Sequence, residues 1–321
     1  MQRFISCDWG TSTLRLRVID KTKMELLGES SSSQGISRVF NLWNRSGRKK
    51  NQRFAFYLNI LKGHIQKLED RMDSSLKGVL LIISGMASSS LGMIELDYRP
   101  VPFAADGSGA RCRKIKRSRV FDHEILVISG ARTDDDVMRG EETLVAGCLH
   151  HKRQERYFIL PGTHSKHVHV KNGEIINIRT FMTGEFFDIL SNKSILSAGI
   201  QERTILNTAA EKKSFVKGVL ESINPNLLHT AFFVRTNSLL NKPGKQENYF
   251  FLSGLLIGTE LREIIKLGKA NITLVASEKM KMFYTLALKT LELPGGGTLS
   301  IEDADKAIIK GQLAIWNHLN H

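Results

Sequence analysis

The chain has 321 residues, of which 41% are hydrophobic and 24% are charged, and these values are typical of a soluble globular protein with a sizeable core. The three cysteines, Cys7, Cys112 and Cys148, are far apart and show neither a CxxC nor a Cys/His spacing, so we expect no disulfide framework and no zinc site. The formal net charge of +14 allows nucleic acid, an anionic surface or anionic small substrates as partners.

The sequence shows no sign of a membrane segment. A membrane-spanning helix needs about 20 consecutive apolar residues, and no such stretch occurs. The first residues begin a strand rather than a secretory signal. We therefore expect a cytoplasmic protein with no membrane partner.

The first predicted element is a hairpin over residues 4–18, in which an apolar strand and an alternating strand are joined by the small polar turn 10–13. Backbone N–H groups in such a turn can converge on an anion, so the turn is a candidate phosphate loop. Asp8, where the first strand ends, could hold Mg²⁺ through water, or it could be an ordinary Asx-turn residue. Arg15 could return to the same site and neutralise phosphate charge.

The next elements predict a mixed sheet covered by helices. A third strand over 24–29, a helix over 54–68 and a buried strand over 79–83 give the order β-β-β-α-β. The small-residue turn 84–93 follows the last of these strands, and open α/β sheets often bind ligands at the carboxyl ends of their strands. Its serines could donate hydrogen bonds to a polar substrate, or the turn could be a flexible loop.

Much of the positive charge lies in two runs, 45–53 and 111–119, which together hold 11 basic residues. Neither run contains aromatic side chains on which bases could stack. We interpret both runs as solvated loops whose field helps to gather anions, with nucleic-acid contact as the alternative.

An acidic segment follows the strand predicted over 122–130. Residues 133–148 begin with three aspartates and pass into a predicted helix with Glu141 and Glu142 in its first turn. Either glutamate could accept the proton of a substrate hydroxyl that attacks a phosphoryl group. The alternative is that both are ordinary acids that stabilise the start of the helix, where small residues allow close packing.

A second hairpin over residues 157–170 repeats the design of the first, with a turn at Gly162, Thr163 and His164 that could also bind an anion. Two such hairpins half a chain apart predict two lobes, 1–130 and 131–321, which face each other across a cleft. His167 and His169 lie on one strand face without further ligands, so we expect no metal there.

The remaining elements complete the second lobe. A helix over 250–267 contains Ser253, Gly254 and Gly258, which predict close packing against a neighbour. A strand over 272–277 ends in small residues that could leave space for a flat ring such as adenine, or could form an ordinary strand-to-helix turn. The last helix, over 302–317, is expected to pack on the first lobe.

Five segments, in order along most of the chain, carry a resemblance to a known family. They are residues 8–15 (DWGTSTLR), 137–143 (VMRGEET), 160–166 (LPGTHSK), 179–185 (RTFMTGE) and 251–258 (FLSGLLIG). The chain resembles the 2-dehydro-3-deoxygalactonokinases, sugar-acid kinases of the actin-like ATPase superfamily. The resemblance implies an α/β protein with the two-lobe actin-like ATPase (ribonuclease H-like) fold, in which each lobe is a mixed sheet flanked by helices and the active site lies between the lobes.

The resemblance also implies an activity, its cofactors and its site residues. The activity is transfer of the γ-phosphoryl group of ATP, with Mg²⁺, to the 6-hydroxyl of 2-dehydro-3-deoxy-D-galactonate in galactonate breakdown. The first lobe would bind the sugar acid and phosphate, and the second the nucleotide. Asp8 would organise Mg²⁺, and Glu141, or as second choice Glu142, would be the catalytic base. The nucleotide and phosphate-binding residues would be Gly10, Thr11, Ser12, Arg15, Gly162, Thr163, His164, Lys166, Gly254, Ala276 and Ser277. The substrate-binding residues would be Gly85, Met86, Ser88, Ser89, Arg139 and Arg179, with one of the two arginines at the carboxylate.

A second hypothesis places a different function on the same scaffold: a nucleotide-dependent sensor or a nucleic-acid-binding protein without phosphotransfer. It predicts salt-sensitive binding to DNA or RNA through the 111–119 run. The kinase hypothesis is preferred because both turns, Asp8 and the acidic helix start have roles in it. The oligomeric state is left open, with a homodimer as one option.

Overall fold

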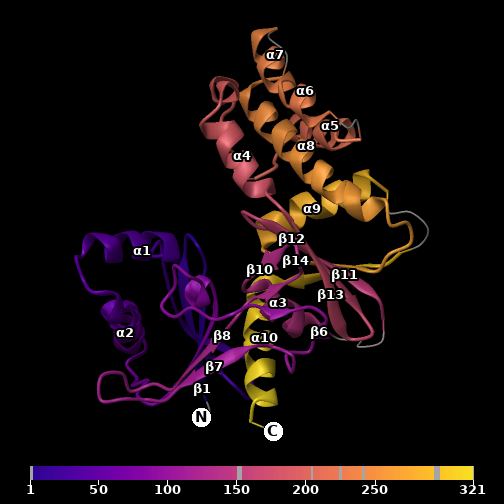
Figure 1. Ribbon diagram of the computed structural model, residues 1–321. Helices are drawn as coiled ribbons and strands as arrows, with labels where there is room; N and C mark the ends of the chain where they lie inside the picture. Colours follow the sequence, from indigo (N-terminus) through magenta and orange to yellow (C-terminus); the bar gives the residue numbers. More distant parts are fainter. Residues whose placement is uncertain are drawn as a thin grey trace. The chain divides into compact units, whose positions relative to one another are not determined.

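The structure is a computed structural model that describes residues 3–149, 154–203, 205–223, 226–240, 243–292 and 297–320 (Figure 1). The chain divides into two compact units. The first comprises Met1–Arg153, Asn172–Ile178 and Asp305–His321, and the second comprises Gln154–Lys171 and Arg179–Ala304. The division at about residue 130, with sugar acid in one lobe and nucleotide in the other, stays a prediction.

The first unit is built on a mixed sheet with the strand order β3-β2-β1-β4-β8-β7. The strands are β1 (Arg3–Trp9), β2 (Leu14–Asp20), β3 (Leu26–Ser32), β4 (Leu80–Gly85), β7 (Cys112–Ile115) and β8 (Ile125–Ile128). The three strands β1, β2 and β3 form an antiparallel meander, whereas β4 runs parallel to both β1 and β8. The strands and the helix of the predicted β-β-β-α-β order are therefore confirmed, with one additional α-helix between β3 and β4.

Helices cover both faces of this sheet because its central strands are apolar on both sides. Alternate residues such as Ile5 and Cys7 pack with α1 (Ile36–Arg45) and α2 (Arg53–Met72). Phe4, on the opposite face, packs with Ile315 of α10 (Ala304–His318). Helix α1 was not predicted, although Ile36, Val39 and Trp43 have helical spacing.

Two sequence expectations, one in each unit, were wrong. Residues 112–115 of the second basic run form the edge strand β7 instead of a loop, because they pair with the buried strand β8. Glu302 and Asp303 belong to a strand, β15 (Leu299–Asp303), and not to the last helix, because they continue its parallel pairing with β14 (Ile272–Ala276).

Smaller elements complete the first unit. A three-stranded sheet contains β5 (Arg99–Pro100), β9 (Ala131–Arg132) and β10 (Val137–Met138), and β6 (Phe103–Ala104) pairs with the start of β13 (Glu174–Phe181). Helix α3 (Glu141–Cys148) packs tightly on α10: a Cβ atom added at Gly147 would lie 1.9 Å from the carbonyl oxygen of Ala307. The close packing that the small residues of this helix predicted is confirmed at Gly147.

The second unit has a sheet of the same kind, in which β15, β14, β11 (Arg156–Leu160) and β12 (Ser165–Lys171) are neighbours in that order. Strands β11 and β12 form the predicted antiparallel hairpin, and β14 runs parallel to β11. The helices are α4 (Thr183–Asn192), α5 (Ala209–Glu221), α6 (Leu227–Ala231), α7 (Phe233–Leu239), α8 (Lys245–Ile265) and α9 (Glu278–Thr290). Each unit thus shows the mixed sheet flanked by helices that the actin-like ATPase fold requires.

Helix α8 is the central helix of the second unit. Ile257 of α8 packs with Ile159, Leu274 and Phe283 from the two parallel strands and α9. A Cβ atom added at Gly254 would lie 2.1 Å from the carbonyl oxygen of Phe215 in α5, so only glycine allows this helix contact. The close packing predicted at Gly254 and Gly258 is therefore confirmed.

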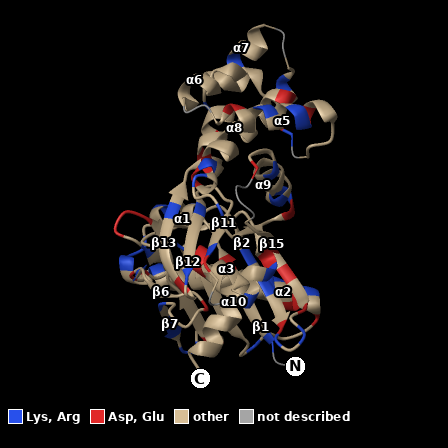
Figure 2. Ribbon diagram, turned by 90° about the vertical axis from the view of Figure 1, so that its right-hand side faces the viewer, with Lys and Arg blue, Asp and Glu red and all other residues tan. Residues whose placement is uncertain are grey.

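Charged residues are spread along both units, with acidic and basic side chains interspersed (Figure 2). Within the described part of the chain, no helix combines the length and the apolar character needed to cross a lipid bilayer.

Candidate active site

In the first unit, three separate segments meet at the carboxyl ends of β1 and β4. Asp8 lies opposite Ser84, and Trp9 lies opposite Gly85, in the parallel pairing of the two strands. Gly85 has a φ of +87°, and a Cβ atom there would lie 2.8 Å from the carbonyl oxygen of Trp9. Gly140, with a φ of +112°, approaches so closely that its Cβ would lie 3.2 Å from the Gly85 Cα. The two glycines thereby bring the start of α3 beside Asp8.

Helix α10 connects the ends of β1 and β4 through Gln312. The Gln312 side-chain amide donates hydrogen bonds to the carbonyl oxygen of Cys7 at 3.0 Å and to the Ser84 hydroxyl at 2.8 Å. Gln312 is fully buried, so these bonds are made in a low-dielectric environment. The strand ends that carry Asp8 and Gly85 are therefore fixed to each other through a helix near the end of the chain.

Asp8 is partly buried and lies among both acidic and basic groups. Burial raises the pKa of Asp8 above its usual value, the positive charges of Arg15 and Arg17 oppose the rise, and the negative charges of Asp305 and Glu141 add to it. Within the described residues, no group of three or more His, Cys, Asp or Glu side chains could hold a metal ion. A single carboxylate such as that of Asp8 is the kind of ligand that Mg²⁺ takes when it keeps most of its waters.

Two arginines of β2 meet one aspartate beside this site. Arg15 and Arg17 each form an ion pair of 2.7 Å with Asp305, and the buried Arg17 also pairs with Glu29 at 3.2 Å. The sequence analysis selected Arg15 but missed Arg17 and Asp305. The alternation of β2 could have revealed Arg17, since residues two apart on a strand lie on the same face.

The two candidate bases differ in their surroundings. Glu142 is buried, accepts hydrogen bonds from the Gly140 N–H at 3.0 and 2.9 Å and from the Thr143 hydroxyl at 3.1 Å, and has a pKa raised to about 7 by burial and by the charge of Glu141. Glu141 is only half-buried, and its carboxylate accepts a hydrogen bond from the Arg139 N–H at 2.8 Å. Glu141 is therefore the more accessible of the two carboxylates.

The serine turn after β4 makes internal hydrogen bonds. Met86–Ser88 forms a short 3₁₀ helix, and the Ser89 hydroxyl donates to the carbonyl oxygen of Met86 at 2.8 Å. The Arg139 guanidinium donates to the Ser88 carbonyl oxygen at 2.6 Å and hydroxyl at 2.7 Å, and it stacks 4.1 Å from the centre of the Tyr98 ring. Ser88 and Ser89 are buried, so their hydroxyls shape the turn from within.

The first phosphate-loop candidate contacts the start of α1. The N–H groups of Ile36 and Ser37 donate to the carbonyl oxygens of Gly10 and Thr11 at 3.0 and 3.1 Å, while Thr11 and Ser12 are exposed.

The second phosphate-loop candidate, at Gly162 and Thr163 in the second unit, packs closely against Gly184. A Cβ atom there would lie 2.6 Å from the Gly162 carbonyl oxygen, and Glu185 N–H donates to the carbonyl oxygen of Thr163 at 3.0 Å.

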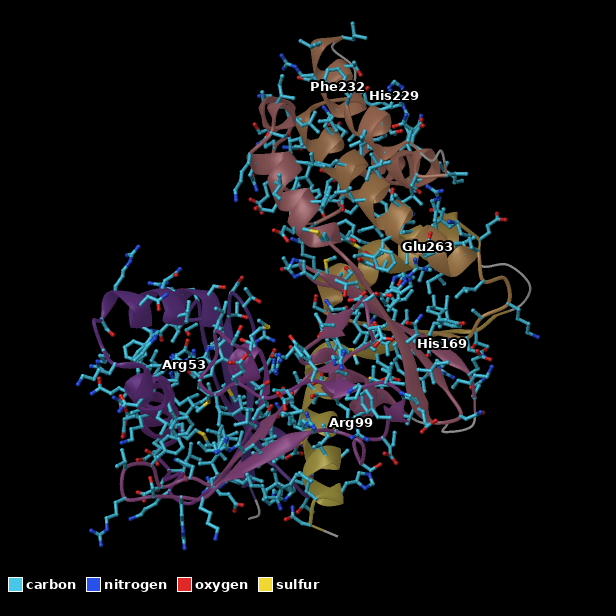
Figure 3. All side chains as sticks on the ribbon, viewed as in Figure 1. Arg53, Arg99, His169, His229, Phe232 and Glu263 are labelled. Carbon is cyan, nitrogen blue, oxygen red and sulfur yellow. The ribbon has the colours of Figure 1, made fainter. Side chains whose placement is uncertain are left out.

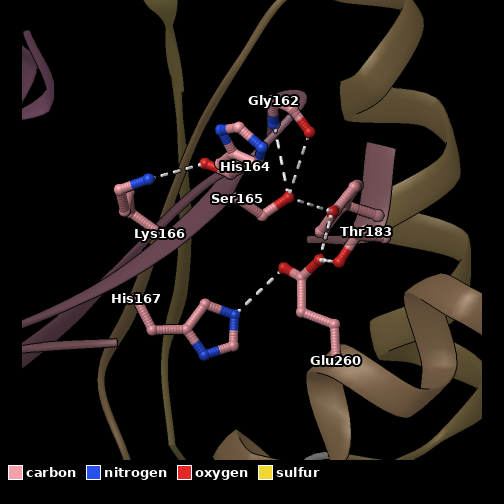
Figure 4. Close-up of polar contacts among 8 residues, drawn as sticks. Gly162, His164, Ser165, Lys166, His167, Thr183 and Glu260 are labelled. Atoms are coloured by element: carbon pink, nitrogen blue, oxygen red, sulfur yellow. Dashed lines mark hydrogen bonds and ion pairs between the residues drawn. The ribbon is translucent and has the colours of Figure 1, made fainter. Parts of the chain in front are cut away.

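A buried network lies below this second loop (Figure 4). Glu260, in the last third of α8, accepts hydrogen bonds from the hydroxyls of Thr183 and Tyr284, and one of its carboxylate oxygens lies 3.1 Å from the Nε2 atom of His167. The Tyr284 and Ser165 hydroxyls are 3.1 Å apart, and the Gly162 N–H donates to Ser165 at 3.3 Å. The sequence analysis missed Glu260, although an acidic residue inside an apolar helix was a visible signal.

The other predicted residues of the second loop are held by polar partners. The His164 imidazole lies 2.6 Å from a carboxylate oxygen of Glu185, and the buried Lys166 donates to the His164 carbonyl oxygen at 3.0 Å. Arg179, also in this unit, forms a 2.8 Å ion pair with Glu263 on the surface. Arg179 and Arg139 therefore lie in different units.

A cavity of about 240 Å³ opens beside the second loop. Its walls are mainly apolar and come from the loop, α4, α8 and α9; they include Gly162, Thr163, Phe187, Tyr249, Ser253, Leu256, Ile257, Met280 and Phe283. Gly254 itself faces α5, and Ala276 and Ser277 lead into α9. The small residues at the end of β14 thus lie next to a helix that lines the cavity.

The chain is similar to known proteins over most of its length. A family model described as 2-keto-3-deoxy-galactonokinase matches residues 8–315. The chain is 30% identical to "Probable 2-dehydro-3-deoxygalactonokinase DgoK1" of Rhizobium meliloti, covering 98% of this chain and 97% of that protein, and 28% identical to the Escherichia coli 2-dehydro-3-deoxygalactonokinase, covering 90% of each. A crystal structure from Sinorhizobium meliloti, assigned as a protein of the same activity, is similar with a TM-score of 0.79 and 28% identity, covering 98% of this chain and 99% of that one.

Proposed function

The chain belongs to the 2-keto-3-deoxy-galactonokinase family and is a sugar-acid kinase, and we propose that it transfers the γ-phosphoryl group of ATP to the 6-hydroxyl of 2-dehydro-3-deoxy-D-galactonate. The observation that carries the proposal is the meeting of Asp8, Gly85 and Glu141 at the ends of β1, β4 and α3. Phosphoryl transfer requires a cation site and a proton acceptor, and in this proposal Asp8 and Glu141 have these two roles. We also propose that the protein is cytoplasmic, because ATP is available there.

In the first unit, Glu141 accepts the proton of the 6-hydroxyl as that oxygen forms its bond to the γ-phosphorus atom, and the bond to the ADP oxygen breaks. Asp8 would hold Mg²⁺, which when bound neutralises phosphate charge. Gly10, Thr11 and Ser12 present an exposed turn to the phosphates. Arg15, already near Asp8, adds positive charge, and Asp305 keeps it in place through their 2.7 Å ion pair.

In the second unit, the 240 Å³ cavity binds the adenine ring, and the adjacent turn at Gly162 and Thr163 binds phosphate. Apolar walls with a polar end are typical of sites for a flat, partly polar ligand. Phe187 and Phe283 supply ring faces, while Lys279 lies at the wall with a positive charge for the phosphates. Lys166 supports the turn by donating to the His164 carbonyl oxygen.

The proposal is tested by measuring ADP release with a panel of sugar acids in the presence of ATP and Mg²⁺. We expect stimulation by 2-dehydro-3-deoxy-D-galactonate and a phosphorylated product in which the phosphate is on the 6-hydroxyl. Stimulation by another sugar acid alone would contradict the substrate assignment. Absence of any sugar-dependent ADP release, with salt-sensitive nucleic-acid binding, would favour the sensor hypothesis instead.

A further inference from the structure

The first unit contains a cavity of about 510 Å³, and Arg139, one of the residues selected above for substrate binding, lines it. It lies between the chain that follows the serine turn and the small sheet of β5, β9 and β10. Six of its lining residues carry charge or a polar ring: Glu95, Asp97, Tyr98, Arg111, Arg132 and Arg139. A cavity with several cationic and acidic groups suits a ligand that is itself charged and rich in hydroxyl groups.

Strand pairing places Arg132 on the cavity side of the small sheet. Arg132 of β9 lies directly opposite Pro100 of β5 and Val137 of β10. Paired residues share a face of a sheet, and Pro100 lines the cavity as Arg132 does. The neighbouring pair, Arg99 and Ala131, belongs to the opposite face.

The three arginines of the cavity differ in how their guanidinium groups are used. Arg139 is bound to Ser88 and stacked on Tyr98, and Arg111 lies 3.3 Å from the carboxylate of Asp97. Arg132 is exposed, and among the described residues its guanidinium has no hydrogen-bond or ion-pair partner. Arg139 also has one unpartnered donor, its buried Nε, but Arg132 is the arginine of this cavity whose whole guanidinium remains available to an incoming anion.

Arg139 connects the cavity to the candidate base. Arg139 lines the cavity through its side chain, and its backbone N–H donates to Glu141 at 2.8 Å. A ligand that extends from Arg132 past Arg139 would therefore approach Glu141 with its far end. Along that path, Glu95 and Asp97 offer carboxylate oxygens that can accept hydrogen bonds from hydroxyl groups.

We propose that Arg132 binds the carboxylate of the sugar acid and so orients its terminal hydroxyl toward Glu141. A guanidinium can donate two parallel hydrogen bonds to a carboxylate, which fixes direction as well as position. The inference rests on the proposed function, because it assigns the carboxylate end of the same substrate. It assigns the carboxylate to Arg132, which the sequence did not indicate, in place of Arg139 or Arg179.

The experiment compares Arg132→Gln, Arg132→Lys and the control Arg99→Gln in the full-length protein. Arg99 is exposed, carries the same charge and belongs to the adjacent strand, but it lies on the opposite face (labelled in Figure 3). Each variant is assayed with 2-dehydro-3-deoxygalactonate and with its uncharged carboxamide analogue. Thermal unfolding is measured in parallel, and Arg132→Lys, which keeps the charge, provides the same test if Arg132→Gln does not fold.

We expect Arg132→Gln to raise the KM for the acid by about 10- to 100-fold, with kcat and the KM for ATP changed by less than about threefold. The preference for the acid over the carboxamide should be lost, and Arg132→Lys should keep only part of it because the forked geometry is gone. Arg99→Gln should behave as the wild type. An unchanged KM in Arg132→Gln, or an equal rise in Arg99→Gln, would overturn the assignment.

The failure of the inference and the failure of the proposed function are distinguishable. If the wild type does not phosphorylate this sugar acid, the proposed function fails. Calorimetric binding of the acid to the wild type and to Arg132→Gln, without turnover, then decides the role of Arg132 by itself. Equal affinities would refute it, and weaker binding to the variant would support it.

Discussion

Glu141 and Glu142 are neighbours in the chain, but their carboxylates are in different environments. The Glu142 carboxylate is buried and accepts hydrogen bonds from Gly140 and Thr143, which anchor the first turn of α3. The Glu141 carboxylate is half-buried and shares the electrostatic surroundings of Asp8. A base must reach its substrate before its pKa matters, so accessibility favours Glu141.

The choice between them predicts opposite results for two matched variants. Glu141→Gln removes the proton acceptor but keeps the shape, so we expect kcat to fall by about 10²- to 10⁴-fold while substrate binding is largely kept. Glu142→Gln should reduce kcat much less, because its amide oxygen can still accept from Gly140. Steady-state kinetics and calorimetric ATP binding measure both effects. If Glu142→Gln loses turnover and Glu141→Gln does not, the two roles must be exchanged.

The raised pKa of Glu142 also predicts how stability depends on pH. Because its folded-state pKa of about 7 is above the usual value of 4.5, the folded protein holds this proton more tightly than the unfolded chain. The resulting stabilisation is fully present below about pH 4.5 and is lost as the pH rises through about 7. Its size is on the order of 3 kcal/mol from the difference between the two pKa values.

Urea denaturation at pH 5 and pH 8 measures this contribution. Glu142→Gln has no carboxyl group to ionise, so the decrease in unfolding free energy between the two pH values should be smaller than in the wild type. Glu141→Gln should also make this decrease smaller, though only in part, because the charge of Glu141 contributes to the raised pKa of Glu142. An identical pH dependence in the wild type and Glu142→Gln would show that this carboxyl group does not titrate in that range.

At the scale of elements, helix α8 supports the second phosphate-loop candidate through one buried carboxylate. Glu260 connects α8 with Thr183 at the start of α4, with His167 in β12 and with Tyr284 in α9. Tyr284 continues the connection to Ser165 and thereby to the Gly162 N–H. Burial raises the pKa of Tyr284 well above its usual value, so its hydroxyl remains a donor to Glu260.

Replacing Glu260 by Gln therefore tests whether the network positions the loop. An amide has a single acceptor oxygen for three donors, so we expect a loss of about 2–4 kcal/mol of unfolding free energy and a KM for ATP raised by roughly fivefold or more. Glu263→Gln, one turn further along α8 at the surface (Figure 3), is the matched control and should change neither quantity much. A stability loss without any change in the KM for ATP would assign Glu260 to the core alone.

At the scale of the whole molecule, the sequence predicted what depends on neighbouring residues. Periodicity identified both hairpins and the apolar helix α8, and the small turns marked the strand ends. Periodicity could not identify Asp305 and Gln312, which contact β2, β1 and β4 from 228 to 305 residues further along the chain. It also missed Arg132, because nothing in a two-residue strand shows that the paired strands would leave its guanidinium beside a cavity.

The net charge of +14 gives a last prediction, because both proposed substrates are anions. A positive field raises the encounter rate with anions and is screened by salt, with a Debye length of about 10 Å at 0.1 M. Replacing the exposed Arg113, Lys116, Arg117 and Arg119 by Gln should therefore lower kcat/KM by about two- to fivefold at low ionic strength, leave kcat unchanged, and have little effect above about 0.3 M salt. The matched variant at Arg45, Arg48, Lys49 and Lys50 removes the same charge from the other basic run and should behave alike. A loss from one run that persists at high salt would instead show that this run makes a specific contact.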